Sequence, residues 1–239
     1  MDLTNENAEV YIFKIGPLLT PDDMQKQLEQ LPLSEQNRIN KYHHQADRQR
    51  SLAAQVFIRK KLKRALNCNL VNIKRSSNGR PYLCPSTHTF SGDFNLSHSE
   101  DKIICGFSSN GKIGVDIESI RPLDLSIIDY CFTQEERKYF NSLQDQERLL
   151  FFYKIWTLKE AYVKAIGTGI TDSFSHFGFD MDMWRLGAVE MRVHMEDASG
   201  YHFKIIEHSN YAAAICSEQP YTKIRFIDDN PLNCIVDLS

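Results

Sequence analysis

The chain has 239 residues, which is enough for one large domain or two smaller ones, each with a hydrophobic core. Hydrophobic residues make up 42% and charged residues 25%, as in a soluble globular protein, and the net charge of −3 argues against broad nucleic-acid binding. The start lacks a basic segment followed by an apolar one, and no apolar run is long enough to span a bilayer, so we expect neither a signal peptide nor a membrane anchor.

The six cysteines predict neither a zinc site nor a disulfide framework. None of them forms a C-x-x-C pair. Several lie in apolar contexts such as KIICGF (102–107), where a free thiol behaves as a small hydrophobic group. We therefore expect reduced thiols and a cytoplasmic protein.

The first half of the chain predicts a mixture of strands and helices. Thr20-Pro21-Asp22-Asp23 has the features of a helix start, because Thr20 can cap the helix and the acids favour its positive end. In chain order, the pattern predicts a strand at 9–16, a helix after Thr20, helical segments from Ser34 to about Leu66, and short strands around 71–75 and 102–108, with turn residues at 76–81.

The second half repeats this mixture. Thr133 and Glu136 have the spacing of a capping box, and Gly167 suits the end of a long helix. The pattern predicts a strand at 112–118, a helix after Thr133, a long helix from about Asp145 to Ile166, and strands at 188–195, 201–207, 211–217 and near 222–227.

A weak internal similarity suggests that the two halves are related. HSEDKIICGFS (98–108) resembles HSNYAAAICSE (208–218), and the two His-Ser pairs lie 208 − 98 = 110 positions apart. We therefore expect an α+β protein with two similar α/β subdomains, residues 1–111 and 112–239, related by a pseudo-twofold axis. No flexible hinge is expected near Gly111, and the active site should lie between the subdomains.

Two acids in the predicted strand 112–118 are candidates for a metal site. Alternation places Asp116 and Glu118 on one face of the strand, while Val115 and Ile117 point into a core. Two adjacent carboxylates repel unless a cation lies between them, and carboxylate oxygens suit Mg²⁺. A solvated strand face is the alternative explanation for an isolated D-x-E.

The segment WTLKEAYVK (156–164) carries charges in a helix that otherwise looks buried. Trp156, Glu160 and Lys164 are spaced i, i+4 and i+8 and share one face, with Lys159 to one side. A surface ion pair between Glu160 and Lys164 is the simplest explanation. The apolar neighbours make a fully exposed face awkward, so we expect the charged edge to line a cleft that holds an ion and an anionic ligand.

Four motifs together resemble those of the 4′-phosphopantetheinyl transferases. They are NGRP (78–81), FNLSHS (94–99), IGVDIE (113–118) and WTLKEAYVK (156–164). Their order, and the separation 160 − 116 = 44, suit the larger, surfactin-synthetase-activating type of this family. Arg80 stands where the family has a lysine, so a planar fork replaces a point charge.

The resemblance implies an enzyme that transfers the 4′-phosphopantetheine group from coenzyme A to a serine of an apo acyl or peptidyl carrier protein, with release of 3′,5′-ADP. It implies Mg²⁺ ligated by Asp116, Glu118 and Glu160, with Lys164 stabilising the leaving phosphate, and Glu160, less firmly, accepting the serine proton. The implied coenzyme A ligands are Arg50, Arg75, Ser76, Arg80, Asn95, Ser97, His98 and Lys164, with Lys41 and Lys74 as weaker candidates.

Two other classes of function fit parts of the pattern. A non-catalytic module would bind nucleotides or carrier proteins without turnover, and a metal-dependent phosphohydrolase would also use three carboxylates. Phe132, Tyr139 and Phe140 could line a groove for a carrier protein, although core packing suits each aromatic side chain better. A monomer should suffice, because one chain holds both halves. The carrier and pathway stay open.

Overall fold

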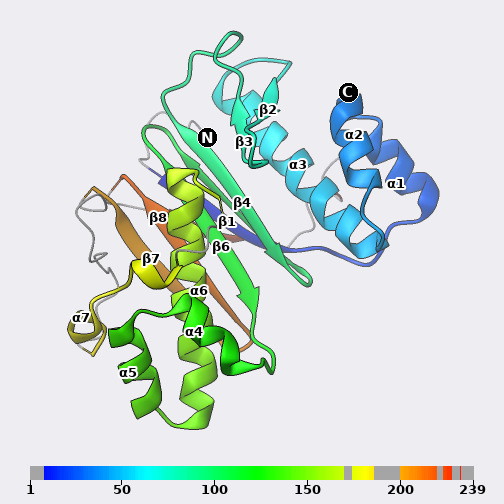
Figure 1. Ribbon diagram of the computed structural model, residues 1–239. Coiled ribbons are helices and arrows are strands. Elements are labelled where there is room, and N and C mark those ends of the chain that lie inside the picture. The colour runs from blue at the N-terminus through cyan, green and yellow to red at the C-terminus, as the bar shows by residue number, and fades with distance from the viewer. Residues whose placement is uncertain (1–7, 170–173, 186–199, 220–222, 228–231, 233–239) are drawn as a thin grey trace.

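The computed structural model describes residues 8–169, 174–185, 200–219, 223–227 and 232. A four-stranded and a three-stranded sheet stand side by side, a long helix packs on each of them, and β2 and β3 form a third, two-stranded sheet (Figure 1). The first part of the chain forms β1 (Ala8–Lys14), α1 (Pro21–Leu28), α2 (Leu33–Asn40), α3 (Gln45–Ala65), β2 (Ile73–Arg75), β3 (Pro81–Leu83), β4 (Asp93–Ser99) and β5 (Lys102–Ser108).

The second part contains the longest helix, α6. Its elements are β6 (Ile113–Ser119), a 3₁₀ turn η1 (Leu125–Ile127), α4 (Ile128–Cys131), α5 (Gln134–Ser142), α6 (Asp145–Ile166), a 3₁₀ turn η2 (Phe174–His176), α7 (Met181–Arg185), β7 (His202–His208), β8 (Tyr211–Ser217) and β9 (Lys223–Ile227). None of the helices in the described part of the chain is long and apolar enough to cross a membrane. The α+β class expected from the sequence is confirmed.

The two larger sheets have the same internal strand order, β4-β5-β1 in one and β7-β8-β6 in the other. In both, an antiparallel hairpin follows the long helix, and its second strand pairs with the first strand of that half. The ladders equate Ser108 with Ser217, a separation of 217 − 108 = 109. This offset differs by one residue from the 110 positions that separate the two His-Ser pairs.

The last strand does not stay with the second half. β9 pairs in parallel with β1, at the edge of the first sheet, and Leu232 is buried in the core beneath α3. Residues 223–227 of the predicted unit 112–239 thus complete the sheet of the other unit.

Most predicted elements are present, and their ends agree with the capping chemistry. Thr20 accepts a hydrogen bond from Asp23 N, Thr133 and Glu136 form a capping box, and Gly167 ends α6 with a φ of 79°. Strands β3 and β4 were not predicted, and the predicted strand 188–195 lies outside the described residues. The five cysteines of the described residues are free thiols.

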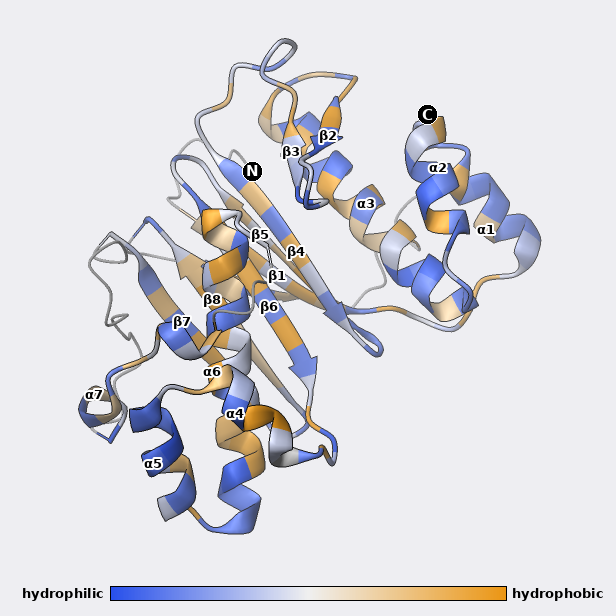
Figure 2. Cartoon of the chain, viewed as in Figure 1, coloured by the Kyte–Doolittle hydropathy of each residue, from blue (hydrophilic) through white to orange (hydrophobic). Residues whose placement is uncertain are grey.

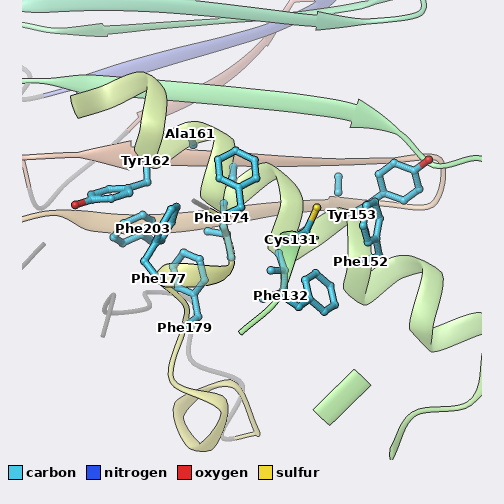
Figure 3. Packing of buried hydrophobic residues seen from close by; sticks show 14 of the residues in the cluster. Cys131, Phe132, Phe152, Tyr153, Ala161, Tyr162, Phe174, Phe177, Phe179 and Phe203 are labelled. Atoms are coloured by element: carbon cyan, nitrogen blue, oxygen red, sulfur yellow. The ribbon is translucent and has the colours of Figure 1, made fainter. Parts of the chain in front are cut away.

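Three buried clusters hold these layers together. One lies beneath α6 and is rich in aromatic side chains, including Phe132, Phe140 and Phe203. This confirms the core role expected for Phe132 and Phe140. Figure 3 shows part of this cluster, with Phe132 and Phe203 labelled. A second cluster lies beneath α3, and a third is shared by the two sheets. Figure 2 shows apolar residues alternating with polar ones along the strands.

Alternation along β6 separates the shared core from the helix side. Ile113, Val115 and Ile117 are fully buried in the cluster shared by the sheets, as expected for the last two. Gly114 lies on the other face, and a Cβ built there would be 1.9 Å from the backbone oxygen of Ala161 in α6. Glycine is therefore needed where strand and helix cross. The acids of β6 share this helix-facing side.

Candidate active site

Side chains rather than backbone pairing join β4 to β6, and this seam carries the site. Ile113 N donates to Asp93 Oδ2 and Val115 N to Asn95 Oδ1, both at 3.1 Å, and Ser119 N donates to Ser99 Oγ. Each pair is 20 positions apart, so the two strands run in the same direction. The alternation of β4 therefore also directs Ser97 toward the acids of β6.

Lys164 lies at the centre of the site. Its Nζ is 2.6 Å from Asp116 Oδ1, 3.0 Å from Ser97 Oγ and 3.9 Å from Glu160 Oε2. Ser97 Oγ also donates to Asp116 Oδ1 at 2.7 Å, and Ser99 Oγ donates to Glu118 Oε2 at 2.8 Å. Two strands and one helix thus bring Asp116, Glu160 and Lys164 together, with Glu118 further along β6.

Burial and mutual repulsion raise the pKa of two of the acids. Burial raises the pKa of Glu160 to about 7, which Lys164 opposes and the charges of Asp116 and Glu118 reinforce. Burial and the Asp116 charge likewise raise the pKa of Glu118. Burial disfavours the Lys164 ammonium, but Asp116 and Glu160 outweigh it and raise the pKa of Lys164. The carboxylates are therefore short of positive charge, while the lysine stays charged.

The donor set at this place fits a hard cation. Asp116 Oδ2 and Glu160 Oε1 are both buried and have no hydrogen-bond partner among the described residues. Unpaired buried carboxylate oxygens are costly unless a cation or a donor meets them. The carboxylates are not gathered as a closed cluster, however: no three His, Cys, Asp or Glu side chains of the described chain have metal-cluster geometry, and the Lys164 ammonium contacts two of the acids. The assignment of all three acids as metal ligands stays a prediction.

A cavity of about 300 Å³ opens beside these groups and is lined by α2, α3, the β2–β3 hairpin, β4 and the C-terminal end of α6. Both parts of the chain therefore form its wall. The predicted site residues that line it are Arg75, Arg80, Asn95, His98, Glu160 and Lys164. Ser97 contacts Lys164, and Ser76 lies in the adjoining turn, where it accepts a hydrogen bond from Arg80 N.

Two arginines on the cavity wall share one buried acid. Glu35, only 5% exposed, accepts from Arg75 Nε at 3.0 Å and from Arg38 Nε at 2.9 Å. The pKa of Glu35 is lowered because these guanidinium groups outweigh its burial. A carboxylate that holds two guanidinium groups fixes their planes, which favours recognition of an anion.

Among the wall residues that the sequence reasoning missed are Arg38, Tyr42, Ser51 and Gln55. They form two pairs at i and i+4: Arg38 on α2 with Tyr42 just beyond its end, and Ser51 with Gln55 on α3. Polar residues repeated on one helix face were the signal that could have found them.

Arg80 uses most of its hydrogen bonds on protein atoms. Its Nη1 and Nη2 donate to the two carboxylate oxygens of Asp93 at 3.1 and 2.5 Å. Its Nε donates to Lys164 O at 2.8 Å and its Nη2 also donates to Ile113 O at 3.2 Å. Four of the five guanidinium N–H groups thus have acceptors within the chain.

The remaining basic candidates lie away from the cavity. Arg50 bonds to Asp47 and to the carbonyl oxygen of Glu100, and it lines a separate depression beside Ser99. Lys41 and Lys74 are exposed and do not line the cavity.

His98, which does line the cavity, has a lowered pKa. Burial is the main cause, followed by the charges of Arg50 and Lys164, so its imidazole is neutral near pH 7.

Lys159 belongs to the core and not to the cavity. Its side chain is fully buried, and its Nζ donates to Glu136 Oε2, Cys131 O and Phe174 O at 2.6 to 2.7 Å. Glu136 is also fully buried and accepts further bonds from Thr133 N and Phe179 N. This saturated ion pair joins α6 to α5 and to the turns beside it. Of the three charges in WTLKEAYVK, two therefore serve the site and one serves the fold.

Comparisons with known proteins point to one family. The model of the 4′-phosphopantetheinyl transferase superfamily matches residues 112–216, and that of the 4′-phosphopantetheinyl transferase N-terminal region matches residues 19–108. The 4′-phosphopantetheinyl transferase HetI of Nostoc sp. is 33% identical over 174 residues, which are 71% of this chain and 73% of that protein.

Two further relatives carry the same description. The 4′-phosphopantetheinyl transferase Sfp of Bacillus subtilis is 26% identical over 220 residues, or 89% of this chain and 93% of Sfp. The transferase gsp of Aneurinibacillus migulanus is 33% identical over 142 residues, and the match spans only 57% of its length.

Proposed function

This chain belongs to the 4′-phosphopantetheinyl transferase superfamily, and on that premise we propose that its Lys164 cavity moves the 4′-phosphopantetheine group from coenzyme A to a serine of an apo carrier protein. The bond between the β-phosphorus and its bridging oxygen breaks, the serine oxygen bonds to that phosphorus, and 3′,5′-ADP leaves. The serine proton must pass to a base, and the leaving phosphate gains negative charge.

One observation carries the proposal. The Lys164 ammonium is fixed by Asp116 and Ser97 at the wall of a cavity that three arginines also line. A fixed positive charge that costs no reorganisation is what the charge developing on a leaving phosphate requires. Lys164 therefore has the role of stabilising and protonating the leaving group.

Glu160 is the candidate base for the serine proton. It lines the cavity, and burial raises its pKa to about 7, which is near the pH at which proton transfer is most effective. Its neighbour Lys164 lies 3.9 Å away and stabilises the ionised form. The base and the acid of the reaction would then stand one helical turn apart on α6.

Asp116, Glu118 and Glu160 would hold Mg²⁺ through carboxylate oxygens, two of which are buried without a partner. When bound, the cation supplies charge neutralisation to the diphosphate. Ligation would lower the basicity of Glu160, so its role as base applies where its second oxygen stays free.

The anionic groups of coenzyme A would be bound by the part of the wall that α2, β2 and β4 form. Arg75 and Arg38, paired through Glu35, present fixed guanidinium planes. The neutral His98 imidazole can donate one hydrogen bond to a phosphate oxygen. These contacts bind and orient the donor before the carrier protein arrives.

A mass measurement tests the proposal. The purified chain, coenzyme A, Mg²⁺ and several apo carrier proteins should yield carriers heavier by one phosphopantetheine arm, and Asp116→Ala should abolish this while the fold stays intact. Carriers that all remain unmodified, under conditions in which another transferase of the family modifies them, would refute it. Phosphate released from a nucleotide without any carrier would instead indicate a hydrolase.

A further inference from the structure

Arg80 lines the cavity, yet its guanidinium faces the protein. It forms a bidentate pair with Asp93, whose side chain is only 7% exposed, and it donates to two backbone carbonyls from other elements. Asp93 in turn accepts from Ile113 N at 3.1 Å. We refer to Arg80 and Asp93 together as the Arg80–Asp93 clamp.

The clamp joins the three elements that carry the reactive groups. Arg80 comes from the β2–β3 hairpin, Asp93 begins β4, Ile113 begins β6, and the carbonyl of Lys164 lies in the last turn of α6. Carbonyls in the last turn of a helix lack partners within the helix, and a cation there also stabilises the helix dipole. One guanidinium therefore fixes the end of α6 against both strands of the seam.

The β2–β3 turn that carries Arg80 makes a second contact with the end of α6. Asn78 Nδ2 donates to Gly167 O at 2.6 Å, directly after the helix ends. The hairpin thus caps α6 through two side chains. The Lys164 backbone is fixed by Arg80, and its ammonium contacts Asp116 at the other end of the side chain.

We propose that Arg80 is a positioning residue that, with Asp93, fixes Lys164 for catalysis, and that it is not a ligand of coenzyme A. This inference rests on the proposed function, and it revises the cofactor-binding role that the resemblance implied for Arg80. Four of its five N–H groups are committed to protein acceptors, so little capacity is left for a phosphate. A lysine has three N–H donors on a single nitrogen, so it cannot pair with both oxygens of Asp93 in a planar fork and also reach the two carbonyls that Arg80 contacts from separate nitrogens.

Arg80→Lys separates the two roles, because it keeps the charge and removes the fork. We expect the turnover rate at saturating coenzyme A to fall about 10- to 100-fold, as for a small displacement of a catalytic group. The Kd for coenzyme A, measured by calorimetry without a carrier, should stay within twofold. Arg148→Lys, at the other end of α6 in a surface ion pair with Asp145, is the matched control and should change neither quantity.

A direct readout follows Lys164 itself and needs neither substrate. Amine acylation followed by mass spectrometry should modify Lys164 slowly in the parent chain, because its ammonium is bonded to Asp116 and Ser97. In Arg80→Lys the labelling of Lys164 should rise several-fold relative to the exposed Lys26, whose side chain is 74% exposed. This readout stands even if the chain proves not to be a transferase.

The opposite results would refute the positioning role of Arg80. A Kd raised tenfold or more with turnover retained would make Arg80 a ligand, and unchanged turnover with unchanged Lys164 labelling would remove its positioning role. If Arg80→Lys does not fold, Asp93→Asn decides, because Asn still accepts from Ile113 N and Asp93 does not line the cavity. Loss of turnover at constant Kd in Asp93→Asn supports the clamp, and full turnover refutes it.

Discussion

Gly114 sets how closely the strand β6 approaches the helix that carries Glu160 and Lys164. A methyl group at this position would lie 1.9 Å from the carbonyl oxygen of Ala161 and 2.5 Å from the amide nitrogen of Ala165. These two residues directly follow Glu160 and Lys164. The obstacle is helix backbone, which cannot rotate away as a side chain can. Gly114→Ala must therefore push α6 away from β6.

The size of the effect follows from this geometry. Ordinary van der Waals contact begins at 3.4 Å, so the helix must retreat by about 3.4 − 1.9 = 1.5 Å at the closest point. Overpacking in a core costs about 1–3 kcal/mol, and we expect about 3 kcal/mol here because backbone must move. A misplacement of 1 Å can cost about 100-fold in rate, so transfer should fall by at least that factor.

Two measurements check this prediction. Urea unfolding gives the loss of stability, and initial rates of carrier modification give the loss of activity. Gly200→Ala is the matched control, since no atom of the described residues lies within 4 Å of a Cβ built there. If Gly114→Ala had the stability and the rate of the parent chain, the distance between β6 and α6 would not be what assembles the site.

The remaining predictions concern charges. Lys159→Met should lower the free energy of unfolding by about 3–5 kcal/mol, because Glu136 stays buried without its partner. Changing both residues to neutral ones should recover part of this loss. Full stability of Lys159→Met alone would contradict the ion-pair argument. Burial raises the pKa of Glu160 to about 7 from 4.5, so in the absence of divalent cations its contribution is fully present below pH 4.5 and is lost as the pH rises through 7. Urea unfolding in EDTA should therefore show that Glu160→Gln gains on the parent chain by on the order of 2 kcal/mol between pH 5 and pH 8, whereas a constant difference would argue against the raised pKa. EDTA should abolish transfer, and added Mg²⁺ should restore it. Transfer that persists in EDTA would contradict the assignment of the three acids as metal ligands.

Local patterns predicted the parts of the site that depend on periodicity. Alternation placed Asp116 and Glu118 on one face of β6, and helical spacing placed Glu160 and Lys164 on one face of α6. The two faces meet because Gly114 allows the backbones of β6 and α6 to approach closely. The glycine is visible in the sequence, but its contact with α6 could not be predicted from it. Only the resemblance to the family motifs predicted that the two segments lie in one site, because periodicity describes each segment by itself.

Non-local partners explain where the sequence reasoning failed. Lys159 looked like part of a charged edge, but its acceptor Glu136 lies 23 positions away and is hidden by folding. The role of Arg50 as a coenzyme A ligand stays a prediction; its guanidinium is bonded to Asp47, one helical turn away, and to the backbone of Glu100. Side-chain direction at Lys159 is set by tertiary contacts that no local pattern encodes.

The duplicated strand order shows that the fold does not itself require the acids. By ladder position Ala8 corresponds to Ile113, a shift of 113 − 8 = 105. Tyr11 and Phe13 of β1 therefore stand where β6 has Asp116 and Glu118, and both aromatic rings pack on Phe57 of α3 at centroid distances of 5.2 and 5.0 Å.

In the seam between β1 and α3, aromatic side chains occupy these two positions, and the buried Glu9 on the same face is paired with Lys61 and Arg225. Between β6 and α6, by contrast, Asp116 and Glu160 each keep one buried oxygen without a hydrogen-bond partner among the described residues. Aromatic burial stabilises such a seam, whereas unpaired buried carboxylates destabilise it. Because the same strand order forms in the first half without acids at these two positions, strand pairing alone does not account for Asp116 and Glu118.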